Sequence, residues 1–302
     1  MAELEYSYLG TPYVPYTKFE EYSERFSPFF SMRREDGIIE VKMHELNDPE
    51  ASANWQYGIH KGWGQLFKLI GQDPENEVLI IGGTGEKFLG IAPQGGKAFD
   101  KAKERDMYDS LYQMYPMYRD GSDLVYNAIF DIHIPTIGVI NGPSPGHTEF
   151  PLLMDMTIMS EDSFIQDPHF TAGYVPGDGQ HLINHYLAGF KQANYMAYMG
   201  TAISAKRAVE LGMANEVVPK DKIYDRAWEM ARTIMTKPRI IRRLTHDLMR
   251  EPLRRFVNDN FQSQFALEWW AAAYDIDPNF RKQGHIGFQH MEDVQNRTDL
   301  ID

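Results

Sequence analysis

The sequence predicts an α/β fold in which strands and helices alternate first and helices dominate afterwards. Short apolar segments bounded by glycine or proline recur between segments with helical spacing, as in proteins built on a largely parallel sheet. From about residue 180 onward the spacing is mostly helical. The 302 residues suffice for one large domain or two modest ones with a substantial core.

Each element is predicted from the period of its apolar residues and from the residues that end it. The expected strands cover residues 37–44, 77–81, 136–140, 154–159, 163–166 and 216–218. The expected helices cover residues 51–69, 97–130 with interruptions at Pro116 and Gly121, a segment from Ser204 to Leu211, and two or three more within 222–274. The Ser204 hydroxyl can accept a free N–H of the first turn, so we expect it to cap its helix.

Four regions follow from this organisation. They are an arm over residues 1–33, an α/β core over 34–220, a helical region over 221–280 and a polar tail over 281–302. The arm is rich in Tyr, Phe and Pro and has no clear period. We therefore expect an irregular segment lying over an apolar surface.

Composition excludes several classes of function. The net charge of −13 argues against a nucleic-acid-binding protein and disfavours a highly anionic ligand such as coenzyme A. The absence of cysteine excludes disulfides, thiolate metal sites and a cysteine nucleophile. No window approaches the roughly 18 apolar residues of a membrane span, and the acidic start does not resemble a secretory signal, so we expect a cytoplasmic protein.

Two motifs invite a functional interpretation and do not support it. Residues 82–85 (Gly-Gly-Thr-Gly) follow a strand but lack the Lys-Ser/Thr of a Walker motif and the spacing of a Rossmann turn. A tight strand exit is the better interpretation. A Gly-x-Ser-x-Gly elbow is absent from the sequence, which makes a serine hydrolase improbable.

Hydrogen-bonding residues gather near three turns, at 141–150, 166–170 and 176–179. His169 and Asp178 are nine positions apart, and a loop of that length can fold the carboxylate onto the imidazole. An Asp that accepts from one ring nitrogen fixes the tautomer and leaves the other nitrogen free to take a proton from water. A satisfied polar core histidine remains the alternative on spacing alone.

The segment from about residue 77 to 219 resembles the crotonase (enoyl-CoA hydratase/isomerase) superfamily. The resemblance rests on Pro135-Thr-Ile-Gly-Val-Ile-Asn-Gly-Pro143 and on the pattern Gly-x-x-Ile-Ser-Ala-x-x-Ala-x-x-Leu-Gly-x-Ala-Asn-Glu-Val-Val from Gly200 to Val218. It implies the ββα spiral core of that superfamily, followed by a C-terminal helical region that forms homotrimers or dimers of trimers.

The departures from the superfamily pattern are informative. Phe150 and His169 stand where the two catalytic glutamates of acyl-CoA hydratases fall. Here the chain instead resembles the 6-oxocamphor hydrolase-type β-diketone hydrolases. His147, His169 and Asp178 match that branch, while the surroundings of His60 and Glu268 resemble its helix histidine and its C-terminal-helix glutamate.

This resemblance implies hydrolysis of a carbon–carbon bond in a cyclic β-diketone by a retro-Claisen reaction that yields a keto acid. His169, oriented by Asp178, would activate water. The backbone N–H groups of Ala92 and His147 would form the oxyanion hole. The His147 side chain or His60 would stabilise the oxyanion or supply a proton.

Other acidic residues are expected to support the site or to take no part in the reaction. Glu268 would orient water or a histidine, whereas Asp167 and Glu149 are expected to be structural or to face solvent. No step needs a metal ion or an organic cofactor. The alternatives are a crotonase that processes acyl-CoA with altered acids, and a catalytically silent subunit of an oligomer.

Overall fold

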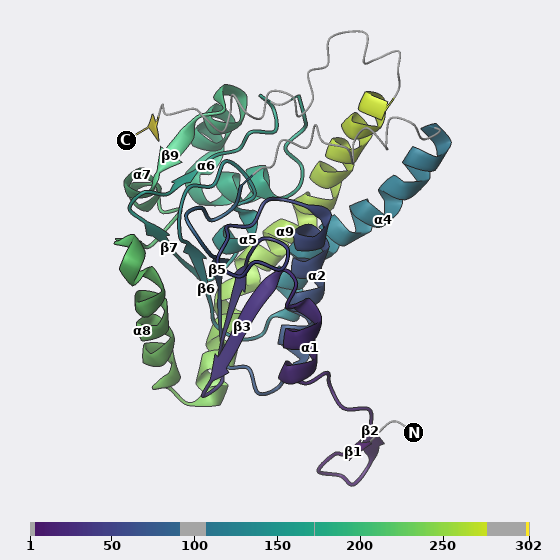
Figure 1. Cartoon of the computed structure of the whole chain (residues 1–302), viewed down its shortest axis with the longest axis vertical. Coiled ribbons are helices and arrows are strands. Elements are labelled where there is room, and N and C mark those ends of the chain that lie inside the picture. Colours follow the sequence, from purple (N-terminus) through teal and green to yellow (C-terminus); the bar gives the residue numbers. More distant parts are fainter. Residues whose placement is uncertain (1–3, 91–106, 172, 277–299, 302) are drawn as a thin grey trace.

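The computed structural model describes residues 4–90, 107–171, 173–276 and 300–301. Its centre is a six-stranded sheet in the order β10-β7-β6-β5-β4-β3, in which only β3 is antiparallel to its neighbour (Figure 1). The strands are β3 (Phe30–Glu35), β4 (Ile38–Met43), β5 (Val78–Gly83), β6 (Thr136–Ile140), β7 (Met156–Ser160) and β10 (Glu216–Val218).

The two faces of this sheet are covered by different helices. Successive residues of a strand point to opposite faces. Along β5, Ile80 packs in the cluster that contains Trp228 of α8 (Ile223–Met235), whereas Ile81 packs in the cluster that contains Trp63 of α2 (Tyr57–Gln72). Strands buried on both faces explain the near-continuous apolar runs in the sequence.

The predicted strands and the predicted cap are confirmed. Each expected strand corresponds to an observed one within about two residues, including the short β8 (Phe164–Ile165). Ser204 accepts the Arg207 N–H at 3.2 Å and starts α7 (Ala205–Glu210). The expected helix over 51–69 starts later, at Tyr57, because Trp55 donates its N–H to Gly90 at 2.7 Å and keeps the preceding segment extended.

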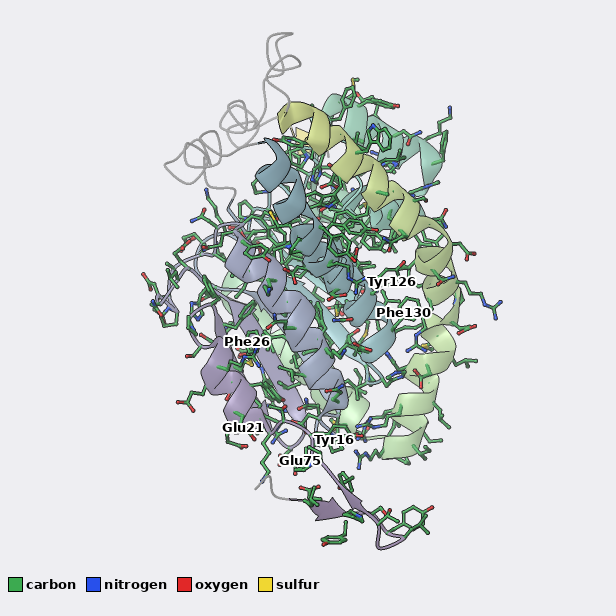
Figure 2. The ribbon with its side chains drawn as sticks, turned by 90° about the vertical axis from the view of Figure 1, so that its right-hand side faces the viewer. Tyr16, Glu21, Phe26, Glu75, Tyr126 and Phe130 are labelled. Carbon is green, nitrogen blue, oxygen red and sulfur yellow. The ribbon has the colours of Figure 1, made fainter. Side chains whose placement is uncertain are left out.

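The expectation of an irregular arm over residues 1–33 is wrong. Helix α1 (Phe19–Phe26) buries Tyr22 and Phe26 in the main core, and β3 adds the edge strand. Within the described part of this arm, the hairpin of β1 (Glu5–Tyr6) and β2 (Pro12–Tyr13) stands clear of the body of the protein (Figure 2). Phe26 of α1, in contrast, lies against the body. Tyr8 and Leu9 at the hairpin tip are 96% and 71% exposed, so the tip does not cover an apolar surface formed by the described residues.

Long helices complete the fold. Helix α4 (Met107–Tyr126) runs through Pro116 and Gly121, the positions of the expected interruptions, and continues into a π-helical turn, η1 (Asn127–Asp131). The remaining helical elements are α5 (Glu149–Leu152), α6 (Gln180–Met199), η2 (Lys220–Lys222) and α9 (Arg239–Ile276).

The chain end returns to the body. β11 (Leu300–Ile301) pairs in parallel with β9 (Ala202–Ser204), which pairs with β8 in a second, small sheet. The rest of the expected polar tail, residues 281–299 and 302, lies outside the described residues. Among the helices that the structure describes, none combines the length and apolarity needed to cross a bilayer.

Candidate active site

The candidate site is built from two loops that follow β6 and β8, with α2 and α9 beside them. Asn141, at the end of β6, accepts the Gly83 N–H at 3.1 Å through its side-chain oxygen and so joins the ends of β5 and β6. Six residues later His147 adopts a left-handed backbone conformation with φ of 53°. Such a conformation is uncommon outside glycine and often marks a functional position.

Asp178 lies at the centre of the site between two histidines. Its Oδ2 is 3.1 Å from Nδ1 of His147 and 3.3 Å from Nε2 of His169. Neither contact has the alignment of a hydrogen bond, so charge holds the three groups together. The other oxygen, Oδ1, accepts the Gln180 N–H at 3.0 Å at the start of α6, which fixes the carboxylate in place. The structure thus brings together the three residues that the sequence singled out.

The second ring nitrogen of His169 is also occupied. Asp167 Oδ1 lies 2.9 Å from Nδ1 of His169 and accepts the His169 backbone N–H at 3.2 Å. The expectation that His169 keeps one free nitrogen is therefore not met. The reason is local, because the Gln166-Asp167-Pro168 turn folds the Asp167 carboxylate under the imidazole two residues later.

His147 has a second carboxylate as well. Glu149 Oε1 lies 3.3 Å from the same Nδ1 that contacts Asp178. Glu149 and Asp167 were expected to be structural or to face solvent, and exposures of 1% and 0% exclude the second of these. One oxygen of each, Glu149 Oε2 and Asp167 Oδ2, has no hydrogen-bond partner among the described residues. The site is a chain of alternating carboxylates and imidazoles, longer than the predicted dyad.

This arrangement favours charged histidines. Burial lowers the pKa of His147, but the carboxylates of Glu149 and Asp178 outweigh it and raise that pKa to about 9. Burial also acts against charge on His169, yet Asp178 and Asp167 raise its pKa well above the usual value. Burial would raise the pKa of Asp178, but the two imidazoliums beside it hold the value well below normal. Burial and the charge of Asp178 raise the pKa of Glu149.

Trp55 connects this cluster to His60 on α2. The indole stacks on the His147 ring with centroids 3.8 Å apart, and His60 meets the indole edge-on at 5.3 Å. No side chain in the described ranges hydrogen-bonds to the His60 ring nitrogens. Burial and the charge of His147 lower the pKa of His60 to about 4, so its imidazole is neutral at pH 7. No local signal in the sequence indicates that Trp55 stacks on a site histidine.

Glu268 enters from the last turns of α9. Its Oε2 accepts the Gly177 N–H at 2.9 Å, which ties α9 to the loop that carries Asp178. A Cβ on Gly177 would lie 2.3 Å from the Gln264 carbonyl oxygen, so only glycine permits this close approach. Burial and the charge of Asp178 raise the pKa of Glu268 to about 8. The backbone N–H of Gly177 contacts one carboxylate oxygen of Glu268, and the expected role of Glu268 in orienting water or a histidine stays a prediction.

Phe150 fills the position at which the sequence comparison placed a hydratase glutamate. It is fully buried, and its ring lies 5.3 Å from that of Trp63 and 5.4 Å from that of Phe88. A carboxylate in this aromatic environment would lose its hydration without gaining a partner. The position serves as an apolar wall.

Of the two backbone groups predicted to form the oxyanion hole, the structure describes one. Ala92 lies outside the described residues. The His147 N–H has no acceptor in the part of the chain that the structure describes, and the left-handed backbone at His147 turns this group away from regular structure. The role of this group in an oxyanion hole stays a prediction.

One set of described His, Asp and Glu residues is compact enough to surround a single cation. Its members are His147, His169 and Asp178, whose nearest side-chain N and O atoms lie within 4.8 Å of one another. Their separations of 3.1 and 3.3 Å are those of direct ion pairs, and we describe the cluster as ion-paired.

Comparison with known proteins places these features in context. Residues 33–292 match the family model described as enoyl-CoA hydratase/isomerase. A carnitinyl-CoA dehydratase of Salmonella enteritidis PT4 is 30% identical over 205 residues, which cover 68% of this chain and 73% of the relative.

Solved structures give the same fold. A β-diketone hydrolase from Anabaena sp. PCC 7120, bound to (S)-3-oxocyclohexyl acetic acid, is 30% identical with a TM-score of 0.75, covering 84% of this chain and 97% of that one. An enoyl-CoA hydratase/isomerase from Mycobacterium paratuberculosis is 26% identical with a TM-score of 0.71, covering 84% and 96%.

Proposed function

The chain belongs to the enoyl-CoA hydratase/isomerase family, and we propose that it hydrolyses a carbon–carbon bond of a cyclic β-diketone to give a keto acid. The observation that carries the proposal is the pair of buried imidazoles, His147 and His169, on either side of Asp178. The solved β-diketone hydrolase, similar over most of both chains, supports it.

The chemistry of a β-diketone suits two positive groups. Attack of water on one carbonyl creates an oxyanion, and collapse of that intermediate expels an enolate stabilised by the second carbonyl. Charge therefore develops on two oxygens in succession. Imidazoliums held rigidly in a buried site stabilise such charge without reorganisation, and one such donor contributes about 10²–10³ in rate.

The role that we assign to His169 differs from the one inferred from the sequence, whereas that of His147 does not. Asp178 and Asp167 occupy both nitrogens of His169, so we assign His169 to the stabilisation of charge rather than to the removal of a proton. Nε2 of His147 and its backbone N–H are the groups that we assign to a substrate oxygen. Glu268, whose carboxyl is neutral below about pH 8, would hold the Asp178 loop and supply a proton.

Processing of an acyl-CoA is the second candidate, and the carnitinyl-CoA dehydratase relative favours it. The buried Phe150 argues against it, because hydration of an enoyl thioester needs acids that deliver water across the double bond. The experiment below distinguishes the two.

The test is mass spectrometry of the purified protein with a panel of cyclic β-diketones in ¹⁸O-water, and with crotonyl-CoA in parallel. We expect a product one labelled water heavier than a diketone, absent with His169→Gln. Turnover of the thioester alone would return the protein to acyl-CoA chemistry. Lys68→Gln, an exposed change on α2, is the matched control and should behave as wild type.

We further propose that the protein self-associates, as a homotrimer or a dimer of trimers. Several large apolar side chains are more than half exposed along one side of α9: Ile240, Ile241, Leu244, Leu248 and Met249. Exposed apolar surface of this kind is typical of subunit interfaces. Light scattering after size exclusion should give three or six copies, and Leu244→Glu should lower that number.

A further inference from the structure

We infer that the N-terminal hairpin of β1 and β2 docks on the exposed apolar side of α9 in a second copy of this chain, an inference that rests on the proposed self-association. The hairpin stands clear of the body of its own chain (Figure 1; Figure 2). The hydrogen bonds described for residues 4–16 all stay within the hairpin. A two-stranded hairpin without further packing is only marginally stable in water, so we expect a surface that covers it.

The turn of the hairpin forms it without help from the body. The Ser7 N–H donates to the Thr11 carbonyl at 2.9 Å, and the Gly10 N–H donates to the Ser7 carbonyl at 2.8 Å. Gly10 has a φ of 76°, the left-handed conformation that closes a three-residue loop between antiparallel strands. The chain therefore presents a preformed element, which lowers the entropy that is lost on docking.

The two faces of the hairpin differ in chemistry. Tyr6 lies opposite Pro12 in the strand register, and side chains alternate between the faces along each strand. On one face the Tyr13 hydroxyl donates to Glu5 at 2.7 Å. The other face holds apolar and aromatic side chains: Leu4, Tyr6, Pro12 and Val14. Tyr6 and Val14 are more than two-thirds exposed, so this face is suited to lie on an apolar surface.

Helix α9 offers such a surface, with matching dimensions. Four of its exposed apolar residues form the α9 stripe: Ile240, Ile241, Leu244 and Leu248. Their spacing places them within about 100° of the helix circumference. The helix rises about 12 Å from Ile240 to Leu248, and an extended strand rises about 13 Å from Leu4 to Tyr8. The apolar face of one hairpin can therefore cover the length of the stripe.

The charges around the two surfaces are complementary. Residues 237–255, which include the stripe, contain seven Lys and Arg against two acidic residues, in a chain with a net charge of −13. Three arginines beside the stripe share the carboxylate of Glu77: Arg239, Arg242 and Arg243. Residues 1–17 contain two glutamates and no Lys or Arg. Opposite charges of this kind favour the encounter of the hairpin with the stripe and fix its register.

A second copy of the chain can supply the stripe. Figure 1 shows the hairpin and the start of α9 at the same end of the molecule but apart from each other. Each copy thus offers one hairpin and one stripe. In a closed symmetric assembly every hairpin meets the stripe of a neighbour, so that no such contact is left open.

The first test uses the absence of cysteine from the chain, because introduced thiols are then the only ones. Tyr8→Cys and Met249→Cys lie at the hairpin tip and beside the stripe, and both leave the docking faces intact. The two variants are produced together in one cell, so that mixed assemblies form, and are treated with a short bismaleimide. Mass spectrometry should identify a link between positions 8 and 249. Lys206→Cys, an exposed change on α7, replaces Met249→Cys in the control and should give no link.

The second test removes the apolar face of the hairpin. In Tyr6→Ser/Val14→Ser the dissociation constant of the assembly, measured by analytical ultracentrifugation over a dilution series, should rise about tenfold or more. The thermal unfolding midpoint of the dissociated chain should not change, because these side chains do not pack in the body. Lys206→Gln should match wild type in both measurements.

The outcomes separate this inference from the proposed self-association. An assembly with an unchanged dissociation constant in Tyr6→Ser/Val14→Ser, and with no link between positions 8 and 249, would overturn the docking of the hairpin alone. A wild type that stays monomeric would overturn both proposals. In the doubly substituted chain Tyr8→Cys/Met249→Cys, a link found at monomer mass under denaturing conditions would place the hairpin on its own α9 and would also overturn the inference.

Discussion

Two buried histidine–aspartate clusters lie among the residues that the structure describes, and they differ in how completely their carboxylate oxygens are matched. One surrounds Asp178 in the candidate site. The other surrounds Asp155, next to β7, where Nδ1 of His246 lies 2.8 Å from the carboxylate and Nε2 contacts the Ile132 carbonyl at 3.1 Å. Arg250 reaches the second oxygen of Asp155 at 3.2 Å.

The difference indicates which cluster is structural. Both oxygens of Asp155 have partners, and although burial acts to raise its pKa, His246 and Arg250 lower it to about 2. Around Asp178 a single oxygen faces two imidazoles, and the outer carboxylates of Glu149 and Asp167 each keep an unmatched oxygen. In the Asp155 cluster the unmatched buried atom is Nε of Arg250, while both carboxylate oxygens are matched. A carboxylate matched at both oxygens stabilises a fold, whereas buried carboxylates with unmatched oxygens are typical of a site that binds something.

The largest expected effect is loss of activity in Asp178→Asn. Without the central negative charge the two imidazoles lose their shared partner, and charge stabilisation at the substrate fails. We expect kcat to fall about 10²–10⁴-fold, measured on a diketone that the wild type hydrolyses. The thermal unfolding midpoint should fall less than in Asp155→Asn, because Glu149 and Asp167 still face the two histidines and Asn can still accept the Gln180 N–H. Equal kcat in variant and wild type would remove Asp178 from the site.

Asp155→Asn should show the reverse pattern. It leaves Arg250 and His246 buried without their counter-charge, and breaking such a pair costs about 3–5 kcal/mol of unfolding free energy. Denaturant titration measures this loss, while kcat per folded molecule should stay close to the wild-type value. A variant that is stable but inactive would mean that the two clusters are not functionally distinct.

Glu268→Gln tests whether ionisation of a buried carboxyl in the candidate site lowers the stability of the protein. The folded pKa of Glu268 is raised to about 8, so the folded state binds a proton more tightly than the unfolded state does. The stability from this group is fully present below about pH 4.5 and is lost as the pH rises through 8. Gln still accepts the Gly177 N–H without carrying a charge. At pH 9 the variant should therefore unfold at a higher denaturant concentration, with a free energy of unfolding larger by on the order of 2 kcal/mol. At pH 4 the two proteins should coincide, and a constant difference across this range would contradict the raised pKa.

The smallest expected effect is that of Ser204→Ala, which measures the contribution of an ordinary hydrogen bond outside both clusters. Its hydroxyl caps α7 through the Arg207 N–H, and loss of an N-cap costs about 1 kcal/mol. Chemical denaturation should show this loss with unchanged activity. Ser204→Asp, which retains an acceptor, should restore most of the stability, and failure to do so would point to packing instead.

The sequence by itself determined the elements whose signals are local. Apolar runs bounded by turn residues located β5, β6 and β7, and Ser204 marked the start of its helix. The resemblance of the site loops to the β-diketone hydrolase branch singled out His147, His169 and Asp178, and the structure brings them within ion-pair distance. Strands β6 and β8 lie in different sheets, and the isolated parallel bridge between Ser144 and Ile165 holds the two loops side by side.

Only the tertiary structure decided which oxygen faces which nitrogen. Asp167 and Glu149 are close to the histidines in sequence, but their burial and direction depend on how the loops pack against α6 and α9. The stacking of Trp55 on His147, and the isolation of His60, join segments far apart in the chain. Proton affinity in a buried site depends on desolvation and on the nearest charges, and both are properties of the packed molecule rather than of any one segment.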